Sequence, residues 1–280
     1  MPDPESPIRR ILVALDASPA SRFAIRTGVD LATRFGAQLV GLFVEDINLL
    51  RVARLPFARE VGSFSPSVRR LDPQDLERQL RRQADQMRRS LARAADPEGI
   101  PWSFQVKRGP VAVEVMTAGA DADLMIMGRV GRSLLAHRRL GSTTRAMVLQ
   151  RPGLLFILTR EVPVSDGAIV LYDGSPAGRK ALEIAPSLGS AANRRLTVIL
   201  VTESREEAAD LREEVLQRLS GFAVEPEIRA LLQPSHQALA WMVRLSGEGP
   251  VVLPCGKQRL EGEKLCSLVD AVANPVLVVR

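Results

Sequence analysis

Four small residues with a regular spacing lie near the middle of the chain. Gly128 and Gly131 are three residues apart, nine residues follow, and Gly141 and Ser142 come next. A short apolar run of strand type precedes them, and a helical pattern begins at Thr143. Glycines let backbone N–H groups turn toward an anion, and a helix N-terminus adds unpaired donors and the positive end of a dipole. This arrangement could bind a phosphate.

The spacing differs from two well-known phosphate motifs. It has no Gly-Lys-Ser/Thr sequence of a P-loop, and no G-x-G-x-x-G follows the first expected strand. A glycine-spaced loop is also compatible with an ordinary turn. Arg129 and Arg132 could clamp phosphates or be solvated, and His137 has no carboxylate or nucleophile partner evident from the sequence.

Apolar strand-like runs alternate with helical patterns along the whole chain, which predicts a parallel sheet with helices on both faces. Ser18 and Pro19 are typical of a helix start, and Gly36 of its end. In the first half, strands are expected at 9–16, 37–44, 102–108, 124–127 and 154–158, and helices at 18–36, 73–95, 110–118 and 143–149. In the second half, strands are expected at 167–173, 196–201, 227–231, 250–254 and 276–279, and helices after 175, at 205–220 and at 235–245.

The second half repeats the first at an offset of 157 residues. Asp16, Ser18 and Pro19 have Asp173, Ser175 and Pro176 as counterparts. An internal repeat of this length predicts two tandem domains of ordinary size. We place them at residues 1–160 and 161–280.

The repeat fails at the glycine loop. In the second copy the counterpart segment, 257–263, is shorter and contains two glutamates, and Lys264 and Leu265 take the places of Gly141 and Ser142. The second domain therefore lacks the glycine clamp, and a phosphate site is expected in the first domain only.

Residues 46–72 form the least regular part of the first domain and are treated as an insertion. They mix leucines and phenylalanines with five arginines. Connections of this length are usually functional or mobile. The segment could be a lid over a ligand or a contact surface for a protein partner, and the sequence does not decide between them.

The charge distribution agrees with an anionic ligand in the first domain. Residues 1–160 hold 25 Lys and Arg against 16 Asp and Glu, a net charge of +9, whereas residues 161–280 have −3. The arginines of the 73–95 pattern alternate with acids and have no aromatic neighbours, so nucleic acid is not the expected partner.

No apolar run approaches the roughly 18 residues of a membrane span, and the polar, proline-rich start is unlike a signal peptide. A cytoplasmic location is the expectation.

These residues together resemble the universal stress protein family in its tandem two-domain form. The resemblance rests on the apolar strand ending in Asp16, the Ser18-Pro19 helix start, the second strand ending in Val44-Glu45-Asp46, and the spacing G-x-x-G-x9-G-Ser that begins at Gly128. It implies an α/β fold: doubly wound domains, each with a five-stranded parallel sheet of order 3-2-1-4-5. It also implies an adenine nucleotide at the carboxyl ends of the strands and domains that pair through their last strands, here within one chain, with a homodimer also open.

The resemblance also implies roles for individual residues. Asp16 and the backbone of Ala14 and Leu15 would lie near the adenine and ribose, and the main chain of Val44 would contact the adenine edge. The phosphate side would be formed by Met127, Gly128, Gly131, Gly141, Ser142 and Thr143, with Arg129 as a further candidate. Asp16 has an alternative role, since a strand-end acid can also cap the following helix.

The function implied is stress-response regulation by a protein that binds ATP in its first domain, with the second domain as pairing partner and other protein partners unknown. Two alternatives stay open: a nucleotide-free protein-interaction module, and slow ATP hydrolysis with Mg²⁺ or Mn²⁺ bridging the phosphates. No residue can be named as a catalytic base or metal ligand, and no P-loop lysine is present. A related ligase class needs a serine- and glycine-rich loop directly after the first strand, where this chain has Asp16-Ala-Ser-Pro19.

Overall fold

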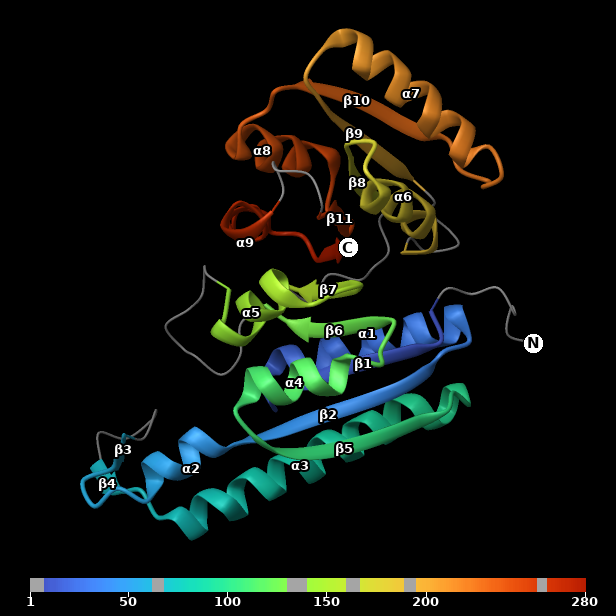
Figure 1. The fold of residues 1–280 in the computed structure, drawn as a ribbon. Coiled ribbons are helices and arrows are strands. Elements are labelled where there is room, and N and C mark those ends of the chain that lie inside the picture. Colours follow the sequence, from blue (N-terminus) through green and yellow to red (C-terminus); the bar gives the residue numbers. More distant parts are fainter. Residues whose placement is uncertain (1–7, 62–67, 130–139, 160–166, 189–194, 256–260) are drawn as a thin grey trace.

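A computed structural model of the chain describes residues 8–61, 68–129, 140–159, 167–188, 195–255 and 261–280. Its main feature is a ten-stranded sheet in the order β10-β9-β8-β11-β12-β7-β6-β1-β2-β5. Neighbouring strands are parallel except β7 and β12, which are antiparallel. The chain thus has two parallel halves that meet edge to edge (Figure 1).

The two halves follow the same order of sheet strands and helices. The N-terminal half contains β1 (Arg10–Leu15), α1 (Pro19–Phe35), β2 (Gln38–Asp46), α3 (Pro73–Ala95), β5 (Trp102–Gly109), α4 (Val111–Gly119), β6 (Leu124–Gly128), α5 (Ser142–Gln150) and β7 (Leu154–Leu158), with a short 3-10 turn at Asp96–Glu98. The C-terminal half contains β8 (Ala168–Tyr172), α6 (Pro176–Leu188), β9 (Leu196–Thr202), α7 (Arg205–Leu219), β10 (Pro226–Leu232), α8 (His236–Ser246), β11 (Val251–Pro254), α9 (Gly262–Ala271) and β12 (Val276–Val279). The expected boundary near residue 160 falls outside the described residues.

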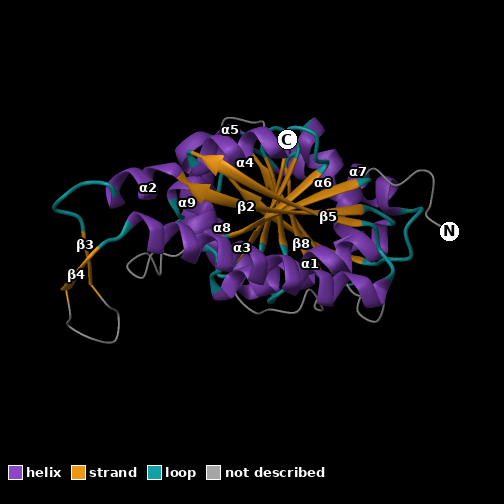
Figure 2. Cartoon of the chain, turned by 90° about the horizontal axis from the view of Figure 1, so that it is seen from below, coloured by secondary structure: helices purple, strands orange, loops and turns teal. Residues whose placement is uncertain are grey.

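Helices pack on both faces of the sheet, as the strand–helix alternation predicted (Figure 2). Buried side chains of α1, α3, α6 and α7 form the core on one face, and those of α4, α5, α8 and α9 form the core on the other. Among the described residues, no helix is both long and apolar enough to cross a membrane. The α/β class expected from the sequence is therefore correct.

The start and end of α1 show how the local sequence sets the bounds of a helix. Pro19 occupies the first turn, where its missing N–H costs no helical hydrogen bond. Gly36 ends the helix with φ of 63°, a left-handed conformation that glycine adopts without steric cost. The sequence signals for this helix were correct at both ends.

The 46–72 segment is more regular than the sequence suggested. It forms a short helix, α2 (Ile47–Ala53), and an antiparallel pair, β3 (Arg59–Val61) and β4 (Val68–Arg70). Figure 2 shows this pair projecting away from the sheet. Exposed apolar side chains lie along the segment, and Phe57 is 74% exposed.

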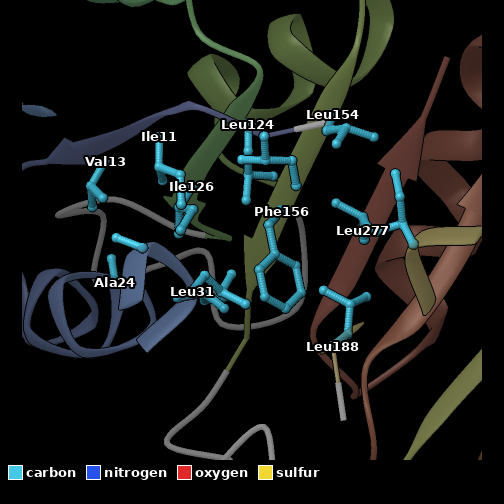
Figure 3. Close-up of a cluster of buried hydrophobic side chains, with 14 of the residues drawn as sticks. Ile11, Val13, Ala24, Leu31, Leu124, Ile126, Leu154, Phe156, Leu188 and Leu277 are labelled. Atoms are coloured by element: carbon cyan, nitrogen blue, oxygen red, sulfur yellow. The ribbon is translucent and has the colours of Figure 1, made fainter. Parts of the chain in front are cut away.

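One apolar core continues across the junction of the halves. Phe156 of β7 lies opposite Leu277 of β12 in the antiparallel register, and Leu188 of α6 packs in the same cluster (Figure 3). Every residue of β7 and β12 is buried. The strands that would be the edges of two separate sheets are therefore central strands of one sheet.

Arg151, which directly follows α5, holds the β6–β7 connection from inside. It is 3% exposed, and its guanidinium donates hydrogen bonds to the carbonyls of Gly119, Ala122, Pro152 and Leu154. Burial lowers its pKa to about 10, and Asp123 opposes that shift. Each of these carbonyls is a buried or part-buried acceptor that the guanidinium satisfies.

Replacing Arg151 by Met should lower the free energy of unfolding by about 3 kcal/mol, because buried carbonyls lose their donors while the side-chain volume is largely kept. Urea unfolding followed by circular dichroism measures the loss. Arg93→Met, at an exposed position on α3, is the control and should change stability by less than about 0.5 kcal/mol. Equal midpoints for the two variants would contradict the structural role of Arg151.

Candidate functional site

A cavity of about 320 Å³ opens at the carboxyl ends of β1, β2 and β6. Residues near the starts of α1, α2, α4 and α5, together with Leu80 of α3, complete its walls. Its volume lies at the lower end of the range of about 300–1,000 Å³ that is usual for small-molecule sites. The cavity is therefore the candidate functional site.

Most of the residues predicted from the sequence surround this cavity. Those that line it are Ala14, Leu15, Asp16, Val44, Met127, Gly128, Gly141, Ser142 and Thr143. Gly131 lies outside the described residues, as do Arg132 and His137. Arg129 is described but does not line the cavity.

The cavity lies where the direction of the chain across the sheet reverses. β1 is central, between β2 and β6. The chain leaves β1 into α1, on one face, and leaves β6 toward α5, on the other. The two connections diverge and leave a crevice, which is where open parallel sheets generally bind ligands.

One side of the cavity is apolar and includes a free backbone edge. Ala14, Leu42 and Met127 line it from the strands, and Val111 and Val115 from α4. The β1–β2 ladder ends at the pair Leu15–Phe43, whereas β2 continues against β5 as far as Asp46. The carbonyl of Val44, on the β1-facing edge, therefore has no ladder partner and borders the apolar space.

The other side of the cavity is formed by the start of α5. The N–H of Gly141 donates to the carbonyl of Arg129 at 3.0 Å, and the hydroxyl of Thr144 donates to the carbonyl of Gly128 at 3.0 Å. Within the described part of the chain, no side chain caps the start of α5, whose N-cap residue is Gly141. The N–H groups of Ser142 and Thr143 have no helical acceptor because they lie in the first turn, so the helix presents free donors to the cavity.

Asp16 has a structural role in the turn that begins α1. Its Oδ1 accepts hydrogen bonds from the N–H of Ser18 at 3.0 Å and from the hydroxyl of Ser21 at 2.9 Å. The same hydroxyl accepts from the N–H of Asp16 at 3.0 Å. These bonds fix the turn before α1 but satisfy no first-turn N–H of the helix, so the capping alternative is not what the structure shows. The residue still lines the cavity.

The side chain of Arg129 is placed differently from the sequence expectation. Its guanidinium donates to the carbonyls of Val269 and Val272, at the end of α9 in the C-terminal half. With its donors used there, the side chain neither clamps a phosphate nor is solvated. We therefore remove Arg129 from the candidate phosphate ligands.

Several lining residues were missed at the sequence level. Val111 and Val115 lie one helical turn apart on α4, a spacing that could have been noticed after the strand that precedes them. Asp46 is the last residue of β2 and caps α2 by accepting from the N–H of Asn48 at 2.9 Å. Leu49 lies on α2, where the sequence gave no periodic signal, so the base of the 46–72 segment belongs to the site.

The corresponding position in the C-terminal half differs at one decisive side chain. At the offset of 157 residues, Leu171 takes the place of Ala14 and is completely buried. The turn around Asp173 is otherwise alike, since its Oδ1 accepts from the N–H of Ser175 at 3.0 Å. The frame is repeated, but a leucine side chain fills the space that Ala14 leaves open.

The fold and the cavity together define a doubly wound α/β protein with a cavity at the strand ends. The sequence profile of the universal stress protein family matches residues 7–152. Because this match covers more than half of the chain, the protein belongs to the universal stress protein family. Comparison with curated protein sequences gives no match.

Solved structures of similar fold extend over nearly the whole chain. A universal stress protein from Archaeoglobus fulgidus has a TM-score of 0.70 at 20% sequence identity, with 97% of this chain and 96% of that chain covered. A putative universal stress protein from Pseudomonas aeruginosa has a TM-score of 0.62 at 15% identity, with 97% and 93% covered. At these identities the likeness establishes the fold.

The turn beside the cavity contains a strained residue. Ala17 has φ of 60°, and its counterpart at the 157-residue offset is Gly174, with φ of 69°. An alanine in the left-handed region costs about 1 kcal/mol relative to glycine. Ala17→Gly should therefore raise the free energy of unfolding by about 1 kcal/mol, measured by urea unfolding.

Two control variants show whether the gain comes from the backbone conformation. Gly174→Ala should be destabilising, because the new Cβ would add strain and lie 2.7 Å from Cδ2 of Leu211. Ala20→Gly, within the first turn of α1, should lower the free energy of unfolding by about 0.5–1 kcal/mol, since glycine is a poor helix former. A loss of stability in Ala17→Gly would contradict the strain assigned to residue 17.

Proposed function

We propose that this protein is a stress-response regulator that binds ATP in its N-terminal half. The C-terminal half acts as its pairing partner. The observation that carries the proposal is a cavity that joins an apolar space beside the unpaired carbonyl of Val44 to the start of α5. A purine and a phosphate chain require these two environments at adjacent places.

The residues present suit the parts of the nucleotide. The adenine ring would lie between the side chains of Ala14 and Met127, against the edge of Val44. The carboxylates of Asp16 and Asp46 border the cavity and can accept hydrogen bonds from ribose hydroxyls. The first-turn N–H groups of α5 would hold phosphate oxygens, and when a divalent cation is bound it would neutralise phosphate charge.

The proposal assigns one nucleotide to each chain. The C-terminal half has Leu171 in the place of Ala14, and its counterpart of α5, the helix α9, begins at Gly262 with Glu261 as its N-cap residue. Its role is to pair with the N-terminal half through β12 and β7. The cytoplasmic location and the possibility of slow ATP hydrolysis remain part of the proposal on the sequence grounds given above.

Calorimetry with ATP and Mg²⁺ tests the proposal directly. We expect about one binding event per chain and a much weaker response to GTP, because a guanine presents a different hydrogen-bonding edge to the backbone of Val44. Two equal sites per chain would contradict the assignment to the N-terminal half. A lack of binding at millimolar ATP would contradict the function and favour the nucleotide-free interaction module.

Ser142→Pro tests the role of the α5 start without changing the helix. Residue 142 is the first residue of α5, where proline is tolerated, and Gly141 already has φ of −60° and ψ of 153°, as a residue before proline requires. The variant loses one N–H donor and the hydroxyl. ATP affinity should fall by about tenfold or more, because a hydrogen bond to a charged group is worth about 1.5–3 kcal/mol.

Two matched variants isolate the backbone donor. Ser142→Ala removes only the hydroxyl and should weaken ATP binding less than the proline does. His236→Pro places a proline at the first residue of α8, in the other half, and should leave ATP affinity unchanged. If Ser142→Pro bound ATP as tightly as the wild type, the start of α5 would not be the phosphate site.

A further inference from the structure

The last helix of the C-terminal half, α9, contacts the glycine-loop region of the N-terminal half. Figure 1 shows α9 and α5 on the same side of the sheet, facing each other across the junction of β7 and β12. Arg129 and Leu140 lie at the two ends of the glycine loop, and residues at the end of α9 bind both of them. We call this pair of ends the neck of the glycine loop.

At the first end of the neck, Arg129 caps the C-terminus of α9. Its Nη1 donates to the carbonyl of Val272 at 2.8 Å and its Nη2 to the carbonyl of Val269 at 2.6 Å. A cation at this position is favoured because the last carbonyls of a helix are unpaired and carry the negative end of its dipole. Burial lowers the pKa of Arg129, and the nearby carboxylate of Asp270 opposes that shift.

At the second end of the neck, Asp270 holds the backbone. Its Oδ1 accepts a hydrogen bond from the N–H of Leu140 at 2.7 Å and lies 3.5 Å from Nη2 of Arg129. One carboxylate oxygen of α9 therefore contacts both ends of the neck. Leu140 directly precedes Gly141, whose N–H donates to the carbonyl of Arg129, so the two ends are also bonded to each other.

Asp270 is linked to the cavity through the backbone segment that it holds. Leu140 is followed at once by Gly141, Ser142 and Thr143, which line the cavity at the start of α5. The orientation of free N–H donors depends on how the chain enters the helix. Fixing the N–H of Leu140 against a carboxylate that is only 24% exposed restricts that entry.

We propose that Asp270 is a positioning residue for the nucleotide site, through which the C-terminal half holds the neck of the glycine loop and sets the affinity for phosphate groups. The inference rests on the proposed ATP binding and goes beyond it. The C-terminal half then does more than cover the edge strand β7, because it supplies a carboxylate on which the geometry of the site depends. By linkage, bound ATP stabilises the contact of α9 with the neck by the same factor.

Asp270→Ala tests this role in the full-length protein. Affinities for ATP and for adenosine are measured by competition against labelled ATP. We expect ATP affinity to fall by about tenfold, from the loss of one charge-assisted hydrogen bond. Adenosine affinity should change by less than about threefold, because adenosine carries no phosphate. Asp270→Asn keeps an acceptor for the N–H of Leu140 and should lie between the wild type and Asp270→Ala.

A control on the same helix separates this effect from general weakening of the junction. Glu263 of α9 pairs with Arg145 of α5 at the surface and makes no contact with the neck. Glu263→Ala should leave the affinities for ATP and adenosine within about twofold of the wild type, since exposed ion pairs contribute little. Urea unfolding of each variant shows whether its fold is intact.

The outcomes separate this inference from the proposed function. If the wild type binds no ATP, the proposed function fails. If the wild type binds ATP and Asp270→Ala binds it equally well, only the positioning role fails. An equal loss for ATP and adenosine would also overturn the role, because it would show a general structural effect instead of control over the phosphate side.

Discussion

The antiparallel pairing of β7 with β12 is the contact on which the rest of the structure depends. Each strand is the last of its half, and each is buried along its whole length. Separated, the halves would expose two apolar strand edges, which are a liability for aggregation. Their pairing continues one apolar core through both halves and brings α5 and α9 onto the same side of the sheet. The neck contacts of Arg129 and Asp270 follow from this placement.

The two halves have the same backbone arrangement but differ in the space that their side chains leave open beside the strand ends. Asp16 and Asp173 both accept the N–H of the serine two residues later and begin a helix in the same way. Arg151 donates to loop carbonyls in one half, and Asn274 donates to the carbonyls of Gly247 and Gly249 in the other. Different side chains thus satisfy the same backbone requirement, since buried carbonyls need donors wherever the fold repeats.

Most of the frame could be predicted from the sequence because its signals are local. Apolar runs gave the sheet strands, and Pro19 with Gly36 gave the bounds of α1. The helix at 73–95 and the strand at 154–158 agree with the structure at both ends. Helix α9 was missed, because the residues before it were read as a shortened loop and its buried face includes Cys266 among only a few leucines and valines.

Of the site, the sequence predicted the residues next to strand ends and the glycine loop, where residue type and position together restrict the backbone. It did not single out Val111, Val115 and Leu49, because their contact with the cavity depends on the tertiary packing of α4 and α2. The role of Arg129 could not be predicted from the sequence either. An arginine beside a glycine loop suggests a phosphate ligand. Its actual acceptors are the carbonyls at the end of α9, which lie more than a hundred residues away in the sequence and come close only in the folded chain.

Because the guanidinium of Arg129 bonds to α9, selectivity between anionic ligands would have to arise from other groups at this site. A guanidinium aimed at the phosphates would bind many anions through charge, whereas backbone N–H groups bind only oxygens that lie along fixed directions. With Arg129 bonded to α9, the proposed phosphate side would depend on the orientation of the first turn of α5. That orientation is set at Leu140 and Gly141, where Asp270 and the carbonyl of Arg129 accept the two N–H groups. A site built on backbone geometry needs a rigid support, and the C-terminal half provides one.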